Sequence, residues 1–175
     1  MKRRNFFQKG IWLIPGIYLF PEVLRSAQSE YAKPVTQEPE KKLNSELVYE
    51  FVLNCHSNLE IVIELEKEEP GLIFASHDWG KGDFENGIEA AGHMGNKKIA
   101  DFLISKGARI NFFTLCMLGK IETVRRILED FPGMLNSKGP HGFTPLHHAN
   151  KGGEDAAKVK ELLLSLGAVE TKITL

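Results

Sequence analysis

A motif of paired helices that end in a glycine turn occurs several times along the chain, and this repetition constrains the fold more than any other feature. The segment from Gly95 reads GNKKIADFLISKGARIN, and FTPLHHANKGG and VKELLLSLGAVE follow from Phe143 and Val159. A period of about 33 residues is typical of repeat proteins, in which each unit packs against its neighbours. The sequence therefore predicts a stack of helical units.

Four units can be aligned on the small residue that ends the first helix of each, which is Ser57, Gly95, Gly119 or Gly153. The second helices follow in register, with apolar residues at helical spacing. The side chains that we expect to face the stack in the last three units are Ile99, Phe102, Leu103, Val124, Ile127, Leu128, Val159, Leu162 and Leu163. Gly107 and Gly167 follow where a helix needs a left-handed C-terminal residue.

The spacing between the aligned positions is uneven, at 38, 24 and 34 residues. The second junction is about nine residues shorter than a period of ~33 residues. We therefore expect residues 110–113 to lead directly into the next helix, without a projecting hairpin. The fourth unit is two residues longer than the second between its matched glycines, so the sequence predicts a distorted stack.

The unit that begins at Thr144 opens with Thr-Pro-Leu-His, and the second helices of units two and four end in Gly-Ala. With these motifs the chain resembles the ankyrin repeat proteins. The resemblance implies an all-α fold, an ankyrin-repeat solenoid of about four helix-turn-helix units with one long hairpin finger. Residues 78–85 read Asp-Trp-Gly-Lys-Gly-Asp-Phe-Glu and resemble a bacterial ankyrin subfamily over roughly residues 45–150. That subfamily implies a fold without a settled activity.

Residues 1–29 have the order of an export signal: a basic start, an apolar run and then small residues. Arg3 and Arg4 resemble a twin-arginine signal, with Phe7 where leucine is usual. An ordinary secretory signal that contains two arginines is the alternative, and both place the protein in the periplasm or outside the cell. The apolar run is about half of the ~20 residues that span a bilayer, so we expect no stable membrane insertion of the mature chain. Whether the signal is cleaved or kept as an anchor stays open.

The rest of the chain divides into a flexible linker at residues 30–44 and an ankyrin-repeat domain at residues 45–175. Removal of residues 1–29 changes the formal net charge from −1 to −5. Because nucleic-acid affinity depends on lysine and arginine contacts with phosphate, we expect no nucleic-acid partner.

We expect this protein to bind another protein, as a monomer, without a cofactor and without catalytic activity. The sequence contains no nucleophile elbow, phosphate loop or paired metal motif. Asp78, Asp83, Glu85, His77 and His141 are the only candidates for catalysis near one rim. The expected partner contacts are in the finger (His77, Asp78, Trp79, Lys81, Asp83, Phe84), on the concave helix positions (His93, Met94, Met117, Leu118) and in one turn (His141, Phe143). In the alternative interpretation of the finger, Trp79 or Phe84 covers the edge of the core.

A second possible function is soft-metal handling or redox protection by cysteine, histidine and methionine side chains on the concave face. Adjacent helices pack ~8–10 Å apart, so ligands on units one and three cannot share one ion. At best His56 or Cys55 pairs with His93 or Met94, and we expect no metal site. The same spacing separates Cys55 from Cys116 by more than the ~7 Å that a disulfide allows, which predicts two reduced, partly buried thiols.

Overall fold

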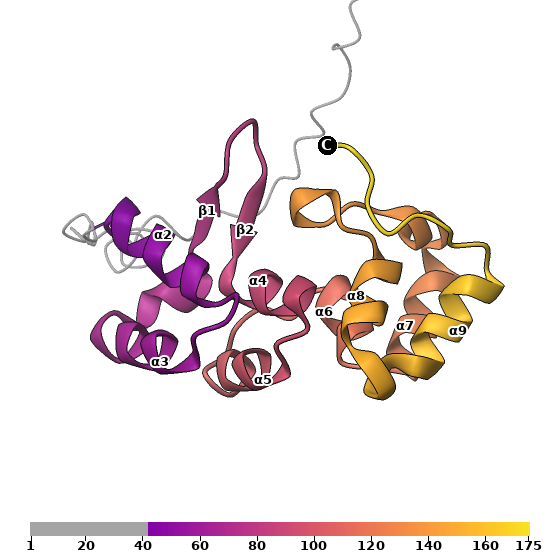
Figure 1. Ribbon diagram of the computed structural model, residues 1–175, viewed down its shortest axis with the longest axis horizontal. Helices are drawn as coiled ribbons and strands as arrows, with labels where there is room; N and C mark the ends of the chain where they lie inside the picture. Colours follow the sequence, from indigo (N-terminus) through magenta and orange to yellow (C-terminus); the bar gives the residue numbers. More distant parts are fainter. Residues whose placement is uncertain (1–41) are drawn as a thin grey trace, which may run out of the picture. The chain divides into compact units, whose positions relative to one another are not determined.

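The computed structural model describes residues 42–175, and these residues are mostly helical. The predicted export signal and most of the predicted linker lie outside the described residues. The helices come in four consecutive pairs (Figure 1): α2 (Ser45–Asn54) with α3 (Leu59–Glu68), α4 (Gly87–Met94) with α5 (Lys97–Ser105), α6 (Phe112–Met117) with α7 (Ile121–Asp130), and α8 (Pro145–Lys151) with α9 (Ala157–Ser165). The first helices of successive pairs contact one another.

Asparagine begins most of the helices. The side chains of Asn44, Asn58, Asn86, Asn96 and Asn111 each accept a hydrogen bond from a backbone N–H in the first turn of the helix that follows. Such a cap satisfies a donor that the helix itself leaves unpaired. At α8 the cap is Thr144, and Pro145 lies in the first turn, where proline fits a helix. The sequence therefore encodes where each of these helices starts.

Short 3-10 helices fill the connections: η1 (Pro70–Phe74), η2 (Pro132–Asn136), η3 (Pro140–Gly142) and η4 (Gly153–Ala156). The first two begin at the proline that stops the preceding helix. The last absorbs the extra residues of the fourth unit before α9 begins.

Glycine is required where successive pairs approach closely. Gly119 has a φ of 67°, and a Cβ there would overlap the carbonyl oxygen of Asp155. Gly107 and Gly167 also have positive φ values, 91° and 95°, as the sequence predicts.

The predicted finger is a two-stranded antiparallel hairpin formed by β1 (Ser76–Asp78) and β2 (Phe84–Asn86), and it projects beyond the helices (Figure 1). His77 pairs with Glu85 across the strands. Because side chains alternate along a strand, Glu85 points inward and is fully buried, whereas Phe84 points outward and is 60% exposed.

The shortened junction has the predicted consequence and one further effect. Helix α6 begins at Phe112, soon after α5 ends, with no hairpin between them. In addition, α4 contacts α8 directly, although α6 and α7 lie between them in sequence. The turn at η3 consequently reaches the hairpin, where the backbone N–H of His141 donates to Asp83.

The core forms two clusters of buried apolar side chains, one mostly from α2–α5 and one from α6–α9. Of the side chains predicted to face the stack, six are buried (Ile99, Leu103, Val124, Leu128, Val159 and Leu163) and three are half-buried (Phe102, Ile127 and Leu162). Cys55 and Cys116 are free, as predicted, although both are fully buried. Within residues 42–175, no helix combines the length and the apolar character that crossing a bilayer requires.

Candidate functional site at the hairpin

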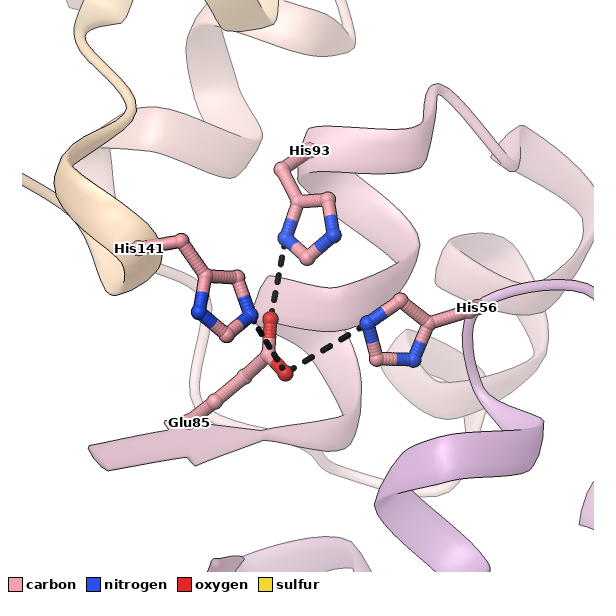
Figure 2. A group of neighbouring side chains, drawn as sticks. All are labelled: His56, Glu85, His93 and His141. Atoms are coloured by element: carbon pink, nitrogen blue, oxygen red, sulfur yellow. Dashed lines mark ion pairs between the residues drawn. The ribbon is translucent and has the colours of Figure 1, made fainter. Parts of the chain in front are cut away.

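Three histidines surround one carboxylate at the base of the hairpin (Figure 2). His56 follows the end of α2, Glu85 is the central residue of β2, His93 lies in the last turn of α4, and His141 lies in η3. Each supplies one potential ligand atom, and these atoms all lie within 4.8 Å of one another. Residues that are far apart in sequence therefore meet at a single point.

Glu85 is the centre of this group. Its Oε2 accepts a hydrogen bond of 2.8 Å from the indole N–H of Trp79. The same oxygen lies 3.5 Å from Nε2 of His56 and 3.4 Å from Nε2 of His141. Burial by itself would raise the pKa of the Glu85 carboxyl, but the His93 and His56 rings and the Trp79 N–H hold this pKa below its ordinary value. Glu85 is therefore ionised at neutral pH.

The outer nitrogens of two of the histidines are fixed by acceptors. Nδ1 of His56 lies 3.0 Å and 3.1 Å from the carbonyl oxygens of Val52 and Leu53. Nδ1 of His141 lies 2.7 Å from Oδ2 of Asp83, whose Oδ1 accepts from the His141 backbone. These contacts determine the orientation of both rings and direct their Nε2 atoms at Glu85.

His93 makes the third approach, and it leaves two buried atoms without hydrogen bonds. Its Nδ1 lies 2.9 Å from Oε1 of Glu85. The pair falls outside hydrogen-bond geometry, so neither atom has a hydrogen-bond partner. Nearly all buried polar atoms in native proteins are satisfied, so this contact is the exception within the group.

Aromatic rings enclose the group. The ring centroid of His93 lies 4.9 Å from that of His56 and 5.2 Å from those of His141 and Phe143. Trp79 packs edge-on against His77 at 4.7 Å. Imidazole and carboxylate groups in such a shell can hold a transition-metal ion or share protons.

The predicted partner-contact residues lie on two faces of this region. The outward or exposed ones are Asp78, Lys81, Phe84 and Met94; the half-buried ones are His77, Trp79, Asp83, Leu118, His141 and Phe143. His93 and Met117 are 4% and 2% exposed, so they present almost no surface to a partner. Trp79 packs against the core as the alternative interpretation proposed, whereas Phe84 does not.

Spacing arguments missed the way in which the group assembles. His56 with His93 is one of the pairings that the sequence allows, but Glu85 is predicted only as a candidate for catalysis, and His141 as a candidate for catalysis and for partner contact. The spacing argument concerns helix positions on units one and three, and it does not cover the turn of the fourth unit, which brings His141 to within 4.8 Å of the other ligand atoms. The alternation of the strand, which turns an acidic side chain inward at Glu85, was the signal available in the sequence.

Part of the chain is similar to curated proteins. No protein-family model matches the chain, and no solved structure matches it. Similar curated proteins include alpha-latrotoxin-Lhe1a of Latrodectus hesperus, alpha-latrotoxin-Lh1a of Latrodectus hasselti and alpha-latrotoxin-Lt1a of Latrodectus tredecimguttatus. Each is 35% identical over 77 residues, which is 38% of this chain. The chain spans only 5% to 6% of the length of these relatives.

Proposed function

We propose that this chain is an exported ankyrin-repeat protein that binds another protein and has no catalytic activity of its own. The consecutive helix pairs and the single hairpin are in keeping with the repeat pattern of the sequence. Rigid scaffolds that present loops are well suited to partner binding.

The observation that carries the proposal is the exposed aromatic side chain on a hairpin with a fixed base. Phe84 is 60% exposed, while Asp83 and Glu85 on either side of it are bonded to His141 and Trp79. A side chain held in this way loses little conformational entropy on binding, which favours affinity. Burial of a phenylalanine against a partner contributes about 1.5–3 kcal/mol.

The proposed contact surface combines Phe84 with the exposed residues Asp78, Lys81 and Met94. His141 and Phe143 extend it as half-buried neighbours and line an open cavity of about 720 Å³ with Asp83 and Lys172. Acidic, basic and apolar groups thus occur together, as in many protein interfaces.

A matched pair of variants tests this proposal. Phe84 and Phe131 are 60% and 64% exposed, but Phe131 follows α7, away from the hairpin. We expect a specific protein to co-purify from the native extract with the wild type and Phe131→Ser but not with Phe84→Ser. Equal capture by both variants would remove the hairpin as the contact surface.

Export is tested separately, by fractionation of the native host. The twin-arginine interpretation predicts that replacement of Arg3 and Arg4 by lysine leaves the protein in the cytoplasm. Continued export of that variant would favour an ordinary secretory signal, and a wild-type protein in the cytoplasm would refute both.

A further inference from the structure

We propose that His56, Glu85, His93 and His141 bind one divalent transition-metal ion, with Zn²⁺ as the best match to the donor set. This site lies on the inner side of the hairpin and shares only His141 with the proposed contact surface. Three observations point to it: the direction of the histidine rings, the short distances between the inward atoms, and two buried atoms without hydrogen bonds.

The proton positions follow from the outer contacts. Carbonyl oxygens only accept hydrogen bonds, so Nδ1 of His56, next to the carbonyls of Val52 and Leu53, must carry a proton. The same holds for Nδ1 of His141 against the Asp83 carboxylate. Nε2 is then the ring atom of each histidine that is free to bind a cation, and both Nε2 atoms lie within 3.5 Å of Oε2 of Glu85.

The four inward atoms all lie within 4.8 Å of one another. A metal ion placed among them would accept an electron pair from each of them. It would also give a partner to Oε1 of Glu85 and Nδ1 of His93, the two buried atoms without hydrogen bonds. One ion would therefore engage the inward nitrogens and both of the atoms that lack hydrogen bonds.

The distances suit a small ion. The three inward nitrogens lie 2.9, 3.4 and 3.5 Å from the nearest oxygen of Glu85. A tetrahedral Zn²⁺ site, with bonds of about 2.0–2.1 Å, places its ligand atoms roughly 3.3 Å apart. The ligand atoms lie as much as 4.8 Å from one another, so the widest separation must shorten by about 1.5 Å for the group to close around an ion.

The outer hydrogen bonds have the form that metal sites use. Asp83 behind His141 gives a carboxylate–histidine pair, and backbone carbonyls orient His56. The indole N–H of Trp79 holds Glu85. Such partners fix the tautomer and the direction of the metal ligands.

The donor set also selects the class of metal. Three imidazoles and one carboxylate suit Zn²⁺ and related divalent ions, whereas Ca²⁺ and Mg²⁺ prefer oxygen ligands. Cys55 lies outside the group, and the Met94 side chain is exposed to solvent. A Cu(I) site built on soft sulfur ligands is therefore not what this geometry favours.

The test is Zn²⁺ titration of the full chain, freed of metal by EDTA, at pH 8. We expect one equivalent to bind, and Co²⁺ in its place to give the intense visible absorption of a tetrahedral complex. His56→Gln and His141→Gln should each weaken Zn²⁺ binding by more than about 100-fold, and Asp83→Asn by about 10- to 100-fold.

The control is His77→Gln, which alters a histidine of the same hairpin that lies outside the group and should leave binding unchanged. If a variant loses its helicity, X-ray absorption of the Zn²⁺-loaded wild type still decides: it should show nitrogen and oxygen ligands, mostly imidazole, and no sulfur. Absence of Zn²⁺ binding by the folded wild type, or full binding by His56→Gln and His141→Gln, would overturn the proposal. The three histidines and Glu85 would then be held together by hydrogen bonds and charge, without a metal ion.

Discussion

Replacement of Trp79 by phenylalanine tests whether the buried carboxylate depends on the indole N–H. The hydrogen bond from Nε1 of Trp79 to Oε2 of Glu85 is 2.8 Å long, and Glu85 is 0% exposed. Hydrogen bonds to charged groups contribute about 1.5–3 kcal/mol. The smaller ring also packs less closely against Tyr49 and His77, so the variant loses packing energy as well.

A double-mutant cycle with Glu85→Leu separates the two effects. The packing loss should occur in both backgrounds and cancel, whereas the hydrogen-bond loss occurs only where Glu85 is present. We expect a coupling of about 2 kcal/mol, measured by urea unfolding at pH 7.5 with EDTA present. A coupling below about 0.5 kcal/mol would show that Trp79 contributes only by packing, and the account of how Glu85 is held would fail.

Three further predictions concern other parts of the chain. Cys55 and Cys116 are fully buried, and burial raises the pKa of Cys116 to about 12. Because the thiolate is the reactive form, both cysteines should react with a thiol reagent at pH 8 only after unfolding. Labelling of the folded protein would contradict this. Burial lowers the pKa of His148 from 6.5 to about 4, so the unfolded chain takes up this proton first as the pH falls. The free energy of unfolding should therefore fall by about 3 kcal/mol between pH 6.5 and pH 4 because of His148. Urea unfolding at several pH values should show this loss in the wild type but not in His148→Asn. Gly107→Ala should cost about 1–2 kcal/mol for its positive φ, and Gly119→Ala clearly more, because its methyl group meets the Asp155 carbonyl; equal unfolding midpoints would refute the steric argument.

Much of the helical framework is predictable because its signals are local. Caps such as Asn86 and Thr144, the proline at position 132 and the apolar spacing at Ile99 and Leu103 act over a few residues. The short junction before Phe112 is also visible as a simple count along the sequence.

The candidate site is less predictable, because it depends on contacts across the whole array. The approach of His141 to Asp83 spans 58 residues, and it requires that no hairpin stand between them. The sequence indicates the missing hairpin but not the distance by which the next turn moves in. The orientation of the His56 ring depends on contacts with two backbone carbonyls. Every residue has a backbone carbonyl, so the sequence does not indicate these contacts.

The contact between α4 and α8 affects how this chain unfolds. In arrays where each unit touches only the next, an end unit can melt while the others persist. Here Asp83 and His141 join the second unit to the fourth, and Glu85 adds His56 of the first. Loss of either end disturbs the other, so denaturation of residues 42–175 should be a single all-or-none step.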